Sequence, residues 1–429
     1  MQKLAATAAF SWCLSHASSG RAVDACETRI SRTNVVRCAV AASLLLEQER
    51  QGIEVEEGRR RAVSPLLPAN PTLALSAGHR KAMGSATAGA QATNWYATLS
   101  QEVEIAGQRG ARRDAAGAAK RAQQHKTLAT ARDVAAAAWR AYFEVLAARE
   151  ALATAERLEQ AFQRIGLAAR QGAASGLLSG VDADVAELTV VRLTQTRIEA
   201  KLRADAALSA LSSLLGLDPA SSRPAVEGEL GPLANATVLP QERVASAVEQ
   251  RPELARAVDV RRGHEHAVTA FRRSRVPNLT FSAFAQRDGF DERVLGAGVS
   301  LPVPLPAPVG RTYAGQLAES EALVRQDTAL LEAARRDARM ELVMASQAYE
   351  AALLQRTLFT EERLAKAEQS LHSIAGELAV GRLSINSVVL VQQTLIEFLR
   401  ASIDAKLAVC LTSVELVRTA ALPLEGGGL

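Results

Sequence analysis

The sequence predicts a mainly α-helical fold with a small antiparallel β part, built as two pseudo-symmetric halves. Three observations predict it: long proline-free helical runs, four short segments of alternating hydrophobicity, and an internal duplication. Equivalent residues of the two halves lie 205 positions apart: Gly110 and Gly315, Gly176 and Gly381, Ser179 and Ser384. A unit of about 200 residues is too long for a solenoid repeat, so we expect two fused halves of one body.

Four segments have the alternation of strands: residues 72–79, 95–105, 278–286 and 294–303. In 95–105, for example, Trp95, Ala97 and Leu99 alternate with polar or small residues, which gives one apolar and one polar face. Segments of about 9 to 11 residues with this pattern are long enough to cross a bilayer as tilted barrel strands.

Four strands cannot close such a barrel, because an open sheet would leave unpaired backbone groups in hydrocarbon. If the strands span a membrane, several copies must share one barrel, most simply as a cyclic homo-oligomer. The strands by themselves allow a second interpretation, a water-facing sheet packed on its own helices.

The helical runs cover residues 110–170 and 315–378, with shorter runs at 182–216 and 241–275. The first has no proline and would extend roughly 90 Å at about 1.5 Å per residue. We expect each long helix to be flanked by two short helices stacked end to end. Its alanine-rich faces suit a barrel of coiled-coil helices, although a generic coiled coil would have the same composition.

Composition excludes some classes of function. The 50 basic and 46 acidic residues give a net charge of +4, a balance that does not favour nucleic acid. No run of 18 apolar residues is present, which argues against a transmembrane helix.

The N-terminal region has the order of a signal peptide over residues 1–17, and residues 18–36 stay unassigned. Cys13 and Cys26 are candidates for lipid attachment, but the residues before each depart from a lipobox. The four cysteines show no metal or redox spacing.

Enzyme chemistry has little support in the sequence. His264 and His266 are two positions apart, which does not place them on one helix face, so we interpret them as solvated surface. No nucleophile elbow, phosphate loop or zinc-binding helix motif is present, and no cofactor is expected.

Several motifs resemble the TolC-type outer-membrane efflux proteins. The motifs are Pro68-Ala-Asn-Pro-Thr-Leu, Leu214-Leu-Gly-Leu217, Arg251-Pro-Glu-Leu254 and Pro277-Asn-Leu279. The stretch from Glu104 to Arg112 is similar to the cobalt-zinc-cadmium resistance branch. The resemblance covers nearly everything after residue 36.

The resemblance implies a homotrimer in the outer membrane, in which four strands per chain form a shared 12-stranded transmembrane β-barrel above a helical barrel in the periplasm. It implies a periplasmic adaptor protein, an inner-membrane pump of the RND type and outer-membrane lipid as partners. The domains expected are 37–217 and 241–421 as repeats, 218–240 as linker and 422–429 as a tail.

Two helical tips are the expected adaptor-docking sites. Gly176, Leu177 and Ser179 form the first tip, and Val380, Gly381, Leu383 and Ser384 form the second. Glycine suits the end of a helix and serine suits the cap of the next, which is a purely structural reason for these residues. The resemblance adds the docking role.

Five acidic residues are candidates for lining the pore: Asp182, Asp184, Glu187, Glu102 and Glu104. Repeated in three chains, the first three would form a cation-attracting ring near the first tip. Acidic residues are also favoured at a helix N-terminus by the helix dipole, which is the simpler explanation. In the second half, Ser387 and Leu390 occupy the region in which the family often places aspartates.

We therefore expect a passive exit duct of a tripartite efflux system, with heavy-metal cations as the substrate. A duct for drugs or for type I secretion is the alternative within the family. A non-membrane coiled-coil scaffold is the alternative from another class.

Overall fold

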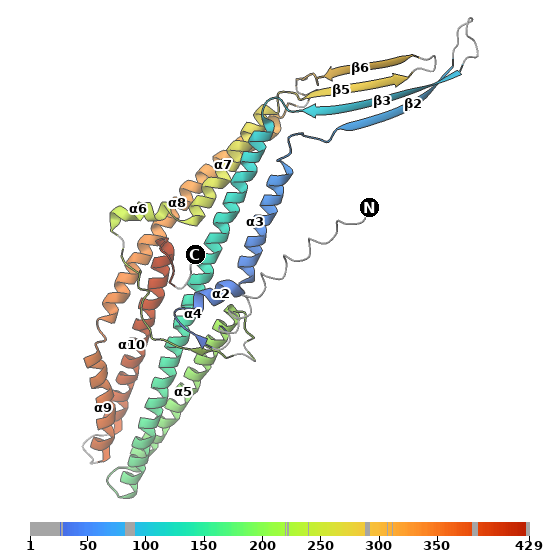
Figure 1. The fold of residues 1–429 in the computed structure, drawn as a ribbon. Helices are drawn as coiled ribbons and strands as arrows, with labels where there is room; N and C mark the ends of the chain where they lie inside the picture. Colours follow the sequence, from blue (N-terminus) through green and yellow to red (C-terminus); the bar gives the residue numbers. More distant parts are fainter. Residues whose placement is uncertain are drawn as a thin grey trace. The chain divides into compact units, whose positions relative to one another are not determined.

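The computed structural model describes residue 26 and residues 29–81, 91–218, 220, 223–238, 240–287, 292–306, 308–310, 312–379 and 385–425 (Figure 1). The predicted signal peptide and the second tip, with Val380, Gly381, Leu383 and Ser384, lie outside these residues. The chain forms two compact units. Unit 1 contains residues 1–48, 128–251 and 336–429, and unit 2 contains residues 49–127 and 252–335. Each unit therefore draws on both predicted repeats.

Unit 2 contains a four-stranded antiparallel sheet of order β2-β3-β5-β6. The strands are β2 (Thr72–Lys81), β3 (Gln91–Val103), β5 (Leu279–Arg287) and β6 (Arg293–Ser300). All four predicted strands are confirmed, and their ends differ from the predicted ones by at most four residues. The outer strands β2 and β6 each have one edge without a strand partner among the described residues.

The register of the sheet aligns its apolar residues in rows on one face. Leu73 pairs with Leu99, Leu99 with Ala283 and Ala283 with Ala297. The next row contains Leu75, Ala97, Ala285 and Leu295. Because side chains alternate along a strand, the residues between these rows point to the other face. That face is richer in polar and small groups, such as Thr98, Ser282 and Gln286.

The helices of unit 2 are α3 (Leu44–Ala62), α7 (Pro252–Arg273) and the adjoining parts of α4 (Gln108–Ala174) and α8 (Ala314–Arg356). Two buried carboxylates join them. Glu49 of α3 accepts hydrogen bonds from Gln123 and Lys126 of α4, and Asp259 of α7 lies 3.1 Å from Arg121. Each buried charge is thus paired, which offsets the cost of its desolvation.

Unit 1 contains the rest of α4 and α8 with α2 (Val35–Ala42), α5 (Gly180–Leu214), α6 (Gln241–Glu249), α9 (Glu361–Ala379) and α10 (Ile385–Thr419). Its main core is built around the aromatic cluster Trp139, Tyr142 and Phe143 of α4. A second core joins α4, α5 and α10 through Phe162, Leu193 and Val388. The short strands β1 (Arg29–Ile30) and β4 (Ala225–Val226) pair in parallel beside the main core.

The first long helix is confirmed and is longer than predicted, with 67 residues from Gln108 to Ala174. The second is not continuous, because α8 ends at Arg356 and α9 begins at Glu361. The Thr360 hydroxyl accepts a hydrogen bond from the Arg363 amide, as in an N-cap, so a new helix begins there.

The run predicted over residues 241–275 is also divided. Helix α6 ends at Glu249 and α7 begins at Pro252, a position where the missing amide hydrogen of proline costs nothing. The Arg251 side chain between them is buried, donates to the Ala338 carbonyl and lies 2.9 Å from the Glu341 carboxylate. The residues of the 251–254 motif thus fix a helix junction.

The fold class predicted from the sequence, mainly α with a small antiparallel sheet, is confirmed. Among the helices that the structure describes, none combines the length and the apolar character needed to cross a membrane.

Candidate functional site: the first helical tip, two exposed seams and the sheet

The chain reversal between α4 and α5 forms the first tip. Gly176 has a φ of +75°, in the left-handed region that favours glycine, and lies two residues after the end of α4. The Leu177 and Leu178 amides both donate to the Gly172 carbonyl, which satisfies an acceptor that the end of the helix leaves open. The predicted role of Gly176 in ending the helix is thereby confirmed.

Ser179 caps the following helix, as its position predicts. Its hydroxyl accepts a hydrogen bond from the Asp182 amide at 3.1 Å, and the Asp182 carboxylate accepts one from the Ser179 amide at 3.3 Å. This reciprocal pair is a capping box. Asp182 is therefore engaged in local structure.

The other acidic residues near this tip differ in their environment. Glu187 lies 2.6 Å from Arg170 of α4, so an opposite charge is close by. Asp184 is exposed, and no ion-pair partner is found for it in the part of the chain that the structure describes. Of the three predicted ring residues, Asp184 alone has a side chain with neither an ion pair nor a hydrogen bond to another described residue.

Leucine and valine side chains surround the tip on the outside. The side chains of Leu177 and Val181 are 71% and 70% exposed, whereas Leu178 packs against the second core. Gly172 makes room for Leu178, because a Cβ at this glycine would lie 2.8 Å from Leu178 Cδ1. The tip thus presents an apolar, backbone-defined surface.

Helix α5 continues this surface as an exposed seam. We define the α5 seam as Val181, Leu188, Val191, Ile198 and Leu202, all of which are exposed. Their spacings of 7, 3, 7 and 4 residues are those of the a and d positions of a coiled coil. A coiled-coil seam requires a facing helix, and the described residues of this chain leave these five side chains exposed.

Helix α8 and the residues after it carry a second exposed seam within unit 1. We define the α8 seam as Met340, Met344 and Leu354, which have a and d spacing on α8, together with Leu358 in the turn after the helix. Neither seam was predicted from the sequence, because each apolar residue by itself is compatible with a buried position. Their heptad spacing is a signal that could have indicated them.

Glu102 of β3 and Glu104, the residue directly after this strand, are not free acids. The Glu104 side chain is buried and both of its oxygens accept from Arg112, at 2.7 and 2.9 Å. Glu102 accepts a hydrogen bond from the Asn278 side chain at 2.7 Å. The predicted pore-lining role of Glu102 and Glu104 stays a prediction, and within the chain the charge of Glu104 is neutralised by Arg112.

The apolar face of the sheet is exposed. Leu73, Leu75, Trp95 and Leu295 are all more than half exposed, although they occupy neighbouring rows of one face. An apolar surface of this extent marks a site that contacts a partner or a membrane.

No metal site is built from the described residues, since no group of three or more suitable side chains converges there. The prediction that His264 is solvated surface is wrong, because its Nδ1 lies 2.6 Å from the Asp327 carboxylate. His266 takes no part in that contact.

Comparison with known proteins connects this architecture with outer-membrane channels. Residues 20–217 match the model of the family described as outer membrane efflux protein. No curated protein matches the chain. Solved structures are similar in fold over nearly the whole chain, at low sequence identity.

Three of these structures are CusC, described in terms of transmembrane channel formation, VceC, an outer membrane protein of Vibrio cholerae, and MtrE, an outer membrane channel of Neisseria gonorrhoeae. CusC has a TM-score of 0.76 and 14% identity, covering 91% of this chain and 92% of its own. For VceC the TM-score is 0.71 and the identity 17%, covering 92% of this chain and 97% of its own. For MtrE the TM-score is 0.71 and the identity 14%, covering 93% of this chain and 90% of its own.

The first half of the chain thus matches the efflux-protein family, and the fold is that of outer-membrane channels across both halves. The resemblance to TolC-type outer-membrane efflux proteins, which the motifs indicate, is confirmed. The cobalt-zinc-cadmium branch stays a prediction.

Proposed function

We propose that the chain is an outer-membrane exit duct that conducts substrate passively and has no catalytic role. The observation that carries this proposal is the four-stranded sheet with one exposed apolar face and two open edges. In hydrocarbon the apolar face is favourable, whereas an open edge is costly, so the edges must be paired by strands from other copies. The efflux-family match supports the same role.

Three copies would complete such a duct. A cyclic trimer gives a closed barrel of twelve strands, and cyclic symmetry uses the same pair of edges in every copy. The α5 and α8 seams support this assembly, because each offers one side of a coiled coil that a neighbouring copy could complete.

Energy for transport would come from partners, since a passive duct does no work. We infer a periplasmic adaptor that docks at the two tips and an inner-membrane pump of the RND type. Support for docking at the first tip comes from the exposed side chains of Leu177 and Val181 on a backbone fixed by Gly176 and Ser179. The docking role of the second tip rests on the duplication and on the resemblance to the efflux proteins, which concern Val380, Gly381, Leu383 and Ser384.

Heavy-metal cations are the proposed substrate, on the basis of the stretch from Glu104 to Arg112. Drugs or secreted proteins are the alternative cargo. For the predicted acidic ring, Asp184 is the residue best able to attract cations, because Asp182 and Glu187 have partners already. A non-membrane scaffold would leave the apolar face of the sheet without a partner.

The docking role is tested by efflux assays in cells that lack the native duct. Leu177→Asp and Leu383→Asp should each abolish resistance while trimers persist in the membrane, because an apolar contact would be replaced by a desolvated charge. Leu44→Asp is the control, since Leu44 is exposed but belongs to neither tip. Wild-type resistance in both tip variants would contradict adaptor docking at these residues.

A further inference from the structure

A short N-terminal segment joins three distant parts of unit 1. We define the clasp as residues 29–38 together with Cys26. Ile30 in β1 is fully buried and pairs with Val226 of β4, in the predicted linker between the repeats. Val35 and Val36 are also fully buried in the main core. The segment is therefore an integral part of unit 1.

Arg32 extends the clasp to the C-terminal end of the chain. Its Nε donates to Glu425 at 3.0 Å, and its terminal nitrogens donate to the Gly231 and Pro232 carbonyls. Its guanidinium also lies over the Trp139 ring, 5.6 Å from the centroid. One side chain thus links the N-terminal segment, the linker and the C-terminal end to the aromatic core.

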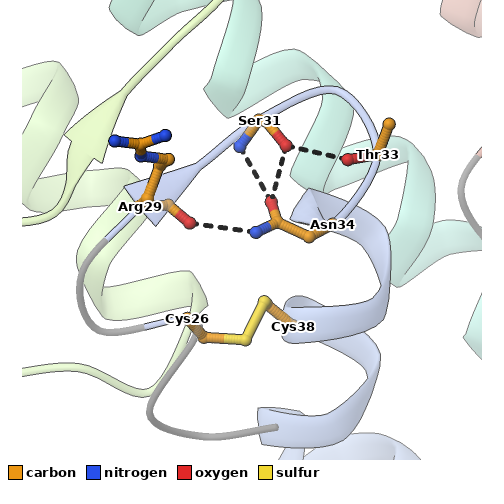
Figure 2. The surroundings of a disulfide bond; sticks show 6 residues. All are labelled: Cys26, Arg29, Ser31, Thr33, Asn34 and Cys38. Carbon is orange, nitrogen blue, oxygen red and sulfur yellow. Dashed lines mark hydrogen bonds between the residues drawn. A yellow bond between two sulfur atoms is a disulfide. The ribbon is translucent and has the colours of Figure 1, made fainter.

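A disulfide between Cys26 and Cys38 closes the clasp (Figure 2). Inside the loop, the Asn34 side chain accepts from the Ser31 amide at 2.8 Å and donates to the Arg29 carbonyl at 2.9 Å (Figure 2). The turn is therefore held by its own hydrogen bonds, and the disulfide fixes its two ends. Cys38 is buried in the main core, so the bond ties the start of the segment to the core itself.

We propose that Cys26 and Cys38 are a thiol-oxidation site, and that the resulting disulfide locks the clasp as a late step in maturation of the exported chain. The same bond precludes lipid attachment at Cys26, because a thioether to diacylglycerol would occupy the sulfur that Cys38 needs. At Cys26 the chain is thus held by a covalent loop and not by an acyl anchor.

The reaction is a dithiol oxidation. Both cysteines lose their thiol protons, one S–S bond forms, and two electrons pass to an oxidised dithiol oxidoreductase, whose own disulfide is reduced. Such oxidants act in the bacterial periplasm and not in the cytosol, where thiols are kept reduced. The inference rests on the proposed function only for this compartment.

Peptide mass spectrometry of the protein recovered from membranes tests the proposal without any mutation. Free thiols are first blocked under denaturing conditions, and the unreduced protein is then cut with trypsin. Cleavage at Arg21, Arg29, Arg37 and Arg50 should release peptide 22–29 linked to peptide 38–50. A diacylglycerol-modified Cys26, or a Cys38 that is blocked before reduction, would overturn the proposal.

A failure of export is distinguished from a failure of the clasp by the location of the protein. Reduced cysteines in protein from the outer membrane contradict the clasp alone. Protein that stays in the cytosol would contradict the proposed function. In that case the disulfide is tested on purified protein incubated with oxidised glutathione. There the 26–38 linkage should form in preference to any linkage with Cys410, and its absence would overturn the proposal.

Two single variants separate a disulfide from an anchor. If the cysteines act as a pair, Cys26→Ser and Cys38→Ser should have the same effect, namely faster tryptic cleavage at Arg32 and Arg37 and a melting temperature lower by about 5 °C. Cys410→Ser is the control for loss of a thiol elsewhere. A diacylglycerol mass that is lost in Cys26→Ser but kept in Cys38→Ser would identify an anchor and contradict the clasp.

Discussion

At the residue scale, one cross-strand pair is packed so closely that it leaves no space for a larger side chain. Gly296 of β6 pairs with Phe284 of β5, and a Cβ at Gly296 would lie 2.3 Å from the ring of Phe284. The ring therefore lies against the glycine backbone and covers it, an arrangement that compensates for the missing side chain of a strand glycine.

A side chain at position 296 should destabilise the β5–β6 hairpin. We expect Gly296→Val to cost about 1–3 kcal/mol, because the Phe284 ring must leave its place. Thermal melting of the detergent-solubilised protein, followed by circular dichroism, measures the loss. Gly78→Val is the control, since nothing lies within 4 Å of a Cβ there. Equal melting temperatures for both variants, or no rescue by Phe284→Ala, would argue against this packing.

Cys410 should be an inert thiol in the folded protein. Burial raises its pKa to about 11, so little thiolate is present near neutral pH. At pH 8 we expect alkylation slower by roughly a hundredfold than for an ordinary thiol, because the thiolate fraction falls tenfold per pKa unit. Quenched time-course labelling with iodoacetamide measures the alkylation rate of Cys410, and unfolding in guanidinium should restore the rate of an ordinary thiol. Rapid labelling of the native protein would show that the site is open.

Single residues differ in how well their roles can be predicted from the sequence. The pattern at Gly176 and Ser179 predicts a helix end and a cap, because both depend on neighbours within a few positions. The Cys26–Cys38 bond depends on tertiary proximity, which spacing alone does not supply. The pairing of Glu104 with Arg112 is likewise set by the turn into α4.

At the element scale, helix ends were harder to predict than helix existence. The break between α8 and α9 has a local signal, since Thr360 followed by Glu361 and Glu362 is typical of a helix start. The break before α7 has Pro252 as its signal. Both breaks were missed because the hydrophobic periodicity continues across them. Periodicity predicts which face of a helix is apolar, but it does not predict where the helix is interrupted.

The α5 seam leads to a prediction about assembly. Leu202→Asp should weaken the trimer, because it places a charge at an a position of the proposed coiled coil. Native mass spectrometry at decreasing protein concentration measures the change as a rise in free monomer. Lys201→Asp is the control, since Lys201 is exposed on the same helix but is not part of the seam. Trimers of unchanged stability in the Leu202 variant would remove this seam from the interface.

At the scale of the whole molecule, the duplication, the period-two strands and the proline-free helical runs predicted the fold class, the sheet and the first long helix. These features repeat over many residues, so the signal accumulates. The two compact units were not predicted, because each is assembled from both halves of the sequence. Surfaces that contact a partner are hard to predict from the sequence. The α5 and α8 seams were recognised only from the solvent exposure of their side chains in the structure.

A shared duct and a scaffold differ most directly in ion conduction. The decisive measurement is planar-bilayer conductance of the detergent-extracted protein, with its mass determined in the same preparation. A duct predicts a trimer with discrete channel events, and block from one side by multivalent cations if Asp184 contributes an acidic ring. A stable protein that is soluble without detergent and never conducts would contradict the proposed function.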